Sequence, residues 1–179
     1  MKGIVFTEFL DMVEGVWGYE MVDEIIEKSE LKSEGIYTSV GTYEYSEMVQ
    51  LLTHLSKSSG KDLPFLLNAY GKYLFETFKK NYPTFFSSAP DLFSFLESID
   101  EHIHVEVLKL YPDAELPKFD TERKGDQVLE MIYKSERRMA DFAEGLLEKT
   151  IEHYQETCTM EKVKLNDSGS EVKFIITKK

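Results

Sequence analysis

Residues 127–137, from which the architecture of the chain can be worked out, are Gln127-Val128-Leu129-Glu130-Met131-Ile132-Tyr133-Lys134-Ser135-Glu136-Arg137. Residues 127–135 alternate in the manner of a β-strand. On a strand, residues two apart share a face, so Tyr133, Ser135 and Arg137 point the same way. Apolar residues precede them on this face and also occupy the opposite one, so we expect a strand that is covered on both sides.

Three hydrogen-bond donors in a row at a covered position need acceptors. A phenol, a hydroxyl and a guanidinium that converge suit a ligand with several carboxylate oxygens, because an arginine can bind a carboxylate in a bidentate way. The alternative is a polar strand end that leads into a helix, with Arg137 paired to an acid at the surface. The row by itself leaves both interpretations open.

The pattern of apolar residues outward from this strand predicts an α+β fold rather than an alternating α/β fold. After the strand we expect a helix over 137–153 and strands over 157–165 and 171–177, with Asn166-Asp167-Ser168-Gly169 as the hairpin turn. Before it we expect a turn-like segment over 37–43, a loop or short helix between Pro83 and Pro90, and helices over 4–17, 21–28, 45–55, 62–79 and 91–110. A helical N-terminal part would therefore be followed by a C-terminal part with a strand, a helix and a hairpin, within a single domain over 1–179.

Composition and charge narrow the class of protein. The formal net charge is −12, and an acidic surface repels the phosphates of nucleic acids and anionic membranes. The N-terminus has no signal-peptide pattern and no apolar run approaches the length of a membrane span, so we expect a cytoplasmic protein. The single cysteine, Cys158, excludes an internal disulfide and a zinc site built from several cysteines.

Motifs of common enzyme classes are missing. The sequence holds no dinucleotide or phosphate-binding glycine loop, no HExxH and no nucleophile elbow. The many carboxylates fall on the polar sides of the predicted helices, where a solvated face is the ordinary interpretation. These observations favour a protein that is not an enzyme.

Two histidines on the predicted helix over 91–110 differ in their surroundings. His102 and His104 lie about 200° apart around a helix, so they point in nearly opposite directions. Polar residues surround His102, which we expect to be exposed, whereas His104 aligns with a mostly apolar row. A lone inward histidine is more often a satisfied core residue than a ligand, so helical spacing alone does not make His104 a metal ligand.

Together these features resemble the haem-nitric oxide/oxygen-binding (H-NOX) domain family, which is related to the sensor domain of soluble guanylate cyclase. In that family a histidine is followed thirteen residues later by a proline and then by a Tyr-x-Ser-x-Arg triad. This chain has His104, Pro117 and the triad Tyr133, Ser135 and Arg137 at that spacing, and the order of predicted elements agrees over 1–179. His102 fits no position of the family pattern.

The resemblance implies a helical N-terminal subdomain that packs on a C-terminal subdomain of helices and an antiparallel sheet, with haem b bound between them. His104 would be the axial ligand of the iron, and Tyr133, Ser135 and Arg137 would hold the haem propionates. Pro117 would press on the macrocycle and bend it. The other face of the haem would be lined by Val5, Phe9, Leu74, Phe78, Phe142 and Leu146.

The same resemblance implies a choice of gas. Oxygen-binding members place a tyrosine where this chain has Phe142, with polar support near Phe9 and Leu74, whereas this chain has no donor at these positions. We therefore expect tight binding of nitric oxide, binding of carbon monoxide and little stable oxygen complex. Nitric oxide would break the bond between iron and His104, and the helix that carries His104 would shift.

Stand-alone members of the family are bacterial and signal to a separate histidine kinase or cyclic-di-GMP enzyme, so we expect such a partner. A cysteine-rich zinc site, present in some members, should be absent here. Three alternatives remain: an oxygen sensor of the same fold, a haem enzyme such as a peroxidase, and an interaction module without a cofactor. A peroxidase would need a distal His or Arg, and we expect His54 and His153 to lie at the surface instead.

Overall fold

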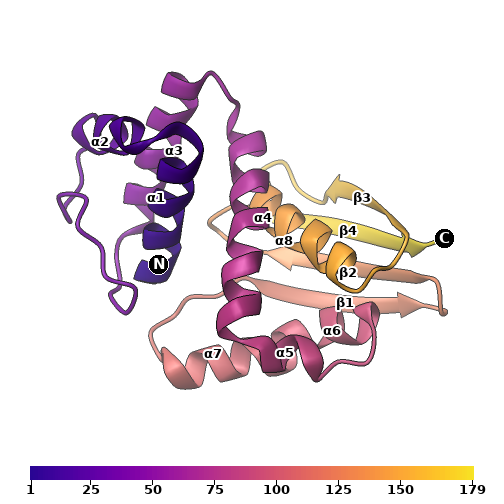
Figure 1. Ribbon diagram of the computed structural model, residues 1–179. Helices are drawn as coiled ribbons and strands as arrows, with labels where there is room; N and C mark the ends of the chain where they lie inside the picture. Colours follow the sequence, from indigo (N-terminus) through magenta and orange to yellow (C-terminus); the bar gives the residue numbers. More distant parts are fainter.

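The computed structural model describes residues 1–179. The protein has a group of helices at one end, two long helices in the centre and a β-sheet at the other end (Figure 1). Three helices form the first end, α4 and α8 run through the centre, and a sheet closes the other end. The helices are α1 (Gly3–Trp17), α2 (Tyr19–Glu27), α3 (Tyr45–Ser59), α4 (Leu63–Asn81), α5 (Pro83–Ser87), α6 (Leu92–Ser98), the π-helical turn η1 (Ile99–Ile103), α7 (His104–Leu110) and α8 (Ala140–His153). The architecture is α+β, as the sequence predicts.

Two apolar cores divide the molecule, and α4 contributes to both. Leu66 and Tyr70 belong to the N-terminal core with the buried residues of α1, α2 and α3. Phe75, one turn further along α4, belongs to the core beneath the sheet. The N-terminal helices thus form one subdomain and the sheet with its helices forms another, and α4 is the wall that they share.

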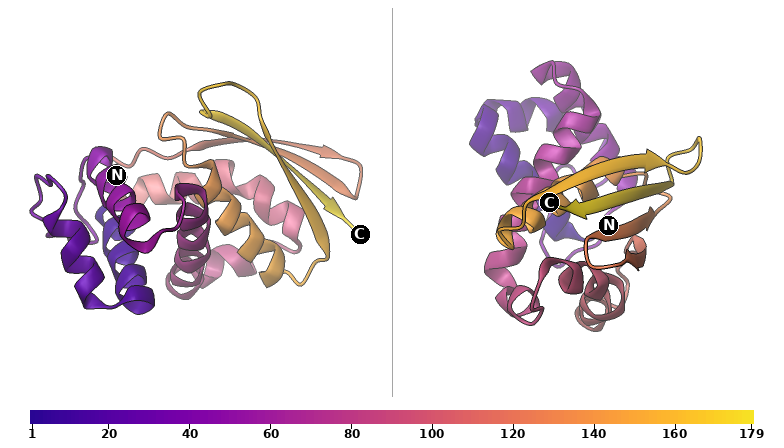
Figure 2. Two further views of the ribbon diagram at one scale, coloured as in Figure 1. Left: turned by 90° about the horizontal axis from the view of Figure 1, so that it is seen from above. Right: turned by 90° about the vertical axis from the view of Figure 1, so that its right-hand side faces the viewer.

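The sheet has four antiparallel strands in the order β1-β2-β4-β3. Their bounds are β1 (Lys118–Lys124), β2 (Val128–Lys134), β3 (Cys158–Lys164) and β4 (Glu171–Lys178). Figure 2 shows the sheet as a layer that lies over the helices on one side. The turn between β3 and β4 is the predicted hairpin, and the Asn166 side chain accepts a hydrogen bond from the Gly169 backbone N–H at 2.9 Å.

The expected cover on both faces of the strand over 127–135 is wrong. Along β2, Leu129, Met131 and Tyr133 are buried, whereas the residues between them are only half-buried. The outer face carries ion pairs, such as Lys173 to Glu130 at 2.9 Å. The apolar residues on that face therefore lie among charged neighbours at the surface rather than beneath a second layer.

Strand β1 is absent from the elements that the sequence predicts. Its residues, Lys-Phe-Asp-Thr-Glu-Arg-Lys, contain one apolar side chain, Phe119, so no alternation is visible. The strand lies at the edge of the sheet and pairs with β2 alone, with Phe119 opposite Tyr133. Charged residues are common on edge strands because they discourage pairing with other chains.

The long helix predicted over 91–110 is divided. Asp91 begins α6 as predicted, because its carboxylate accepts a hydrogen bond from the Ser94 backbone N–H at 3.0 Å. The helix then widens into η1, where the backbone N–H of His104 bonds to the carbonyl of Ile99 five residues earlier. Such π-turns are rare and concentrate at functional sites. The widened turn makes His104 the first residue of α7.

The helix predicted to begin at 137 begins instead at Ala140, after a turn. The backbone N–H of Arg138 bonds to the carbonyl of Ser135 at 3.1 Å, and Arg138 itself has a φ of +54°. Arg137 therefore lies in a turn and not on a continuing strand. The other predicted helices and strands are confirmed, with ends displaced by a few residues, and none of the helices is long and apolar enough to cross a membrane.

Helices α4 and α8 cross with their backbones in contact. A Cβ atom on Gly71 would lie 2.1 Å from the carbonyl oxygen of Phe142, and a Cβ atom on Gly145 would lie 2.1 Å from the carbonyl oxygen of Asn68. Because both obstacles are backbone atoms, they cannot move aside cheaply. The crossing therefore requires glycine on both helices.

We predict that Gly145→Ala destabilises the protein by about 1–3 kcal/mol, since the added methyl group must push α8 away from α4. The matched control is Gly15→Ala, because Gly15 lies in α1 with nothing within 4 Å of an added Cβ. That control should be neutral or more stable by about 0.5–1 kcal/mol. Denaturant unfolding measures both, and equal stability of the two variants would contradict this view of the crossing.

Candidate functional site

A cavity of about 290 Å³ lies between the two cores, and 25 of its 32 lining residues are hydrophobic. Its walls come from the start of α1, from α4, α7 and α8, from the segment 111–117 and from the end of β2. Ten of the eleven residues predicted from the sequence line it: Val5, Leu74, Phe78, His104, Pro117, Tyr133, Ser135, Arg137, Phe142 and Leu146. Segments that are far apart in the sequence thus meet around one apolar space.

Phe9 is the predicted residue that lies outside the lining. It stands one helical turn after Val5 on α1 and is fully buried in the N-terminal core. Its ring packs edge-on against Tyr70, with the centroids 5.3 Å apart. Helical spacing places Val5 and Phe9 on one face of α1, but it does not reveal how deep each residue lies.

His104 enters the cavity from the start of α7. Its side chain is only 16% exposed, and its Nδ1 atom lies 3.3 Å from a carboxylate oxygen of Asp100. Burial lowers the pKa of His104, and the hydrogen bond with Asp100 raises it by less. The imidazole is therefore neutral near pH 7, which is the form that binds metals. His102 is exposed, as predicted, and lies outside the lining.

The other two histidines lie outside the lining as well. His54 is half-buried on α3. His153, at the end of α8, is half-buried too, and its ring lies 5.4 Å from that of Phe86. Both are thus partly exposed at the surface, and neither one lines the cavity.

The three polar residues at the end of β2 meet at one side of the cavity. The hydroxyl of Tyr133 accepts a hydrogen bond from the backbone N–H of Met139 at 2.9 Å. Arg137 pairs with the carboxylate of Glu115 at 2.5 Å and donates to the backbone carbonyl of the same residue at 2.8 Å. Since Glu115 is 84% exposed, it is the surface acid that the alternative interpretation of Arg137 called for. An exposed side chain can turn away and leave Arg137 to a carboxylate inside the cavity.

The side of the cavity formed by α1, α4 and the first half of α8 is apolar. Val5, Leu74, Phe78 and Phe142 carry no hydrogen-bonding group in their side chains. Tyr70 lies behind this wall, with its ring 5.1 Å from Phe142. Its hydroxyl donates to the carbonyl of Val5 at 2.5 Å, so this phenol is already engaged.

Sequence reasoning missed three tyrosines in this region. Tyr70 stands one helical turn before Leu74, so the spacing of α4 could have indicated it. Tyr82 and Tyr111 line the cavity, and burial followed by the nearby Tyr111 raises the pKa of Tyr82. Tyr82 and Tyr111 directly follow the ends of α4 and α7. Beyond the end of a helix, helical periodicity does not predict which way a side chain points.

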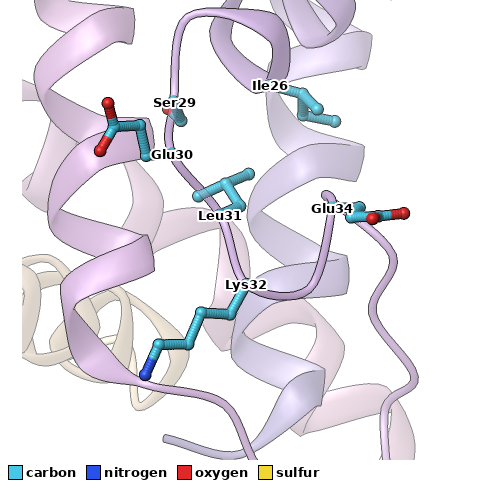
Figure 3. Close-up of a pocket in the computed structure, with 6 residues that line it drawn as sticks. All are labelled: Ile26, Ser29, Glu30, Leu31, Lys32 and Glu34. Atoms are coloured by element: carbon cyan, nitrogen blue, oxygen red, sulfur yellow. The ribbon is translucent and has the colours of Figure 1, made fainter.

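A second hollow lies at the surface where α2 passes into the following loop (Figure 3). Its side chains point in different directions rather than toward a common centre, and Lys32 pairs with Glu44 at 2.5 Å. The residues are Ile26, Ser29, Glu30, Leu31, Lys32 and Glu34. This hollow lacks the convergent polar groups of a binding site.

Both the sequence and the fold of this chain are similar to those of known proteins. Residues 2–162 match the family model described as Haem-NO-binding. The Fe(II) unliganded H-NOX protein from K. algicida shares 50% sequence identity and superposes with a TM-score of 0.96, over 100% of this chain and 97% of that chain. The comparison with curated proteins found no match.

Two further solved structures show the same fold. The H-NOX from Shewanella woodyi, bound to IWP-051 in the Fe(II)CO ligation state, is 43% identical with a TM-score of 0.85, over 100% of this chain and 95% of that chain. The H-NOX protein from S. oneidensis in the Fe(II)NO ligation state is 27% identical with a TM-score of 0.91, over 100% of this chain and 99% of that chain.

We predict that the protein prepared without a ligand loses stability as the pH falls below about 6.5, the ordinary pKa of histidine. Burial lowers the pKa of His104 and of His153 in the folded chain. The unfolded chain therefore takes up protons at a pH where the folded chain does not, and acidification favours unfolding. His104→Gln and His153→Gln should each flatten the pH dependence of the unfolding free energy. An unchanged slope in both variants would show that these histidines are not protected by burial.

Proposed function

Because the chain belongs to the haem-NO-binding (H-NOX) family, we propose that it is a cytoplasmic haem-based sensor that is selective for nitric oxide over oxygen. The domain binds haem, and its family consists of gas sensors rather than enzymes. We propose that it catalyses no reaction and passes its signal to a separate protein. The observation that carries the proposal is a neutral imidazole and a carboxylate-binding group on the walls of one apolar cavity.

The residues of the cavity fit a haem. Bound haem would supply an iron that can hold both an imidazole and a diatomic gas, and nitric oxide would weaken the bond to that imidazole. His104 presents a buried imidazole to the cavity and would be the axial ligand. Arg137 would exchange the carboxylate of Glu115 for a propionate, with Tyr133 and Ser135 beside it. Pro117, also in the lining, would press on the ring from the side of His104.

The apolar wall supports the choice of gas. Oxygen on ferrous haem carries negative charge on its outer atom, and a nearby donor would stabilise that charge. Val5, Leu74, Phe78 and Phe142 offer no donor, and Tyr70 already donates to the carbonyl of Val5. Nitric oxide and carbon monoxide depend less on such a donor, so an apolar wall favours them over oxygen.

The signal would leave through α7. His104 is the first residue of this helix, so release of the imidazole would free the helix and the segment 111–117 from one side of the haem. The two positions of α7 would be the two states between which the gas selects. We propose a histidine kinase or a cyclic-di-GMP enzyme as the separate protein that reads the shift.

The first test is the absorption spectrum of the ferrous protein before and after nitric oxide, and in air. We expect a five-coordinate complex with nitric oxide and no stable complex with oxygen. His104→Gly should retain haem weakly unless imidazole is supplied, because the variant lacks the axial ligand. A stable oxygen complex would overturn the proposed selectivity for nitric oxide. Peroxide turnover with an organic donor would favour the alternative of a haem enzyme. A colourless protein, expressed with sufficient haem, would overturn the whole proposal.

Phe142→Tyr should create a stable oxygen complex, because it places a phenol donor on the apolar wall. The matched control is Phe142→Leu, which disturbs the packing beside Tyr70 without adding a donor and should leave oxygen binding weak. Oxygen titration of the ferrous variants measures both. If Phe142→Leu gains oxygen as strongly as Phe142→Tyr does, packing and not hydrogen bonding selects the gas.

A further inference from the structure

The carboxylate of Asp100 lies between two N–H groups that come from different elements. One oxygen, Oδ1, lies 3.3 Å from Nδ1 of His104 and also 3.3 Å from the backbone nitrogen of Phe119. Asp100 belongs to η1, His104 begins α7 and Phe119 lies in β1. A single oxygen atom therefore joins the turn, the helix and the edge strand beside the cavity.

The chemistry of this contact determines which nitrogen of His104 carries the proton. A carboxylate can only accept hydrogen bonds, so Nδ1 must be the donor. A neutral imidazole has one N–H, and Nε2 is then left with its lone pair free. That lone pair is what a metal requires.

We infer that Asp100 is a positioning residue that holds His104 in the Nδ1–H tautomer and, through its negative charge, sets how strongly the imidazole donates to the iron. The inference rests on the proposed role of His104 as the axial ligand. Carboxylates in this position raise the basicity of metal-binding histidines and fix the orientation of their rings.

The hydrogen bond from the backbone N–H of Phe119 anchors the carboxylate of Asp100 to the sheet. The Phe119 N–H lies on the sheet and not on α7, so this second bond would hold the carboxylate in place if the helix shifted as proposed. The ring of Phe119 also lies against the imidazole, with the centroids 5.9 Å apart. The orientation of His104 is thus tied to the sheet, whereas its backbone is tied to the helix that would carry the signal.

The neighbouring carboxylate in η1 provides a matched control. Glu101 follows Asp100 directly but is exposed, and the hydrogen bonds to His104 and to Phe119 come from Asp100 and not from Glu101. Asp100→Asn keeps the size of the side chain and an acceptor oxygen but removes the charge. Glu101→Gln removes the same charge one residue away.

The experiment measures the iron–histidine stretching frequency of the ferrous protein by resonance Raman spectroscopy. Asp100→Asn should move this frequency lower, weaken haem retention by about tenfold and speed the conversion to the five-coordinate nitric oxide complex several-fold. Glu101→Gln should leave all three unchanged. An Asp100→Asn variant with the wild-type frequency, or equal shifts in the two variants, would overturn the inference.

A measurement on the wild-type chain covers the case in which Asp100→Asn fails to fold. In the diamagnetic ferrous protein with carbon monoxide, the Nδ1–H proton of His104 should exchange slowly with solvent, because it is hydrogen-bonded to Asp100. Exchange as fast as that of an exposed imidazole would overturn the inference. His104→Gly separates the two proposals, because an iron–histidine band that persists in that variant refutes the ligand role of His104 itself.

Discussion

The backbones of α4 and α8 touch where Gly71 and Gly145 lie, and the cavity depends on this contact. Phe142 and Leu146 stand on α8 on either side of Gly145, and Leu74 follows Gly71 on α4 by one turn. Side chains on these two helices therefore form one wall of the cavity. The position of this wall is set by contact between the two backbones, which cannot adjust as side-chain packing can. The two cores also meet along α4, so the same contact positions the N-terminal helices relative to the sheet.

Irregular backbone then directs the polar groups toward this apolar wall. The widened turn η1 sets His104 at the start of a new helix, and the turn with Arg138 at positive φ ends β2 before Arg137. Neither residue would face the cavity in the same way on a regular helix or strand. Irregular geometry of this kind persists where the surrounding structure holds it, and here it coincides with the residues that carry the proposed chemistry.

Regular elements could be predicted from the sequence because they repeat, and the irregular ones could not. Periodic apolar residues indicated α1, α3 and α4 and the paired strands. The motif spacing supplied His104, Pro117 and the Tyr-x-Ser-x-Arg triad, and the family resemblance supplied the other five of the ten predicted residues that line one cavity. Strand β1 was missed because pairing with β2, and not its own composition, makes it a strand. The π-turn and the depth at which Phe9 is buried depend on contacts between elements. The spacing of residues along a single element does not predict such contacts.

The segment 111–117 is held to its neighbours by ion pairs at the surface. Asp113 accepts hydrogen bonds from Thr42 at 2.6 Å and from Lys2 at 3.2 Å, so it ties this segment to the N-terminal subdomain, while Glu115 ties it to Arg137. Both carboxylates are largely exposed, and ion pairs at the surface contribute little to stability because water and salt screen them. The glycine crossing of α4 and α8, by contrast, cannot shift without opening a buried interface. Under the proposed function, a change at His104 would therefore be transmitted through α7 and the segment that follows it, whereas the apolar wall on α4 and α8 would keep its place.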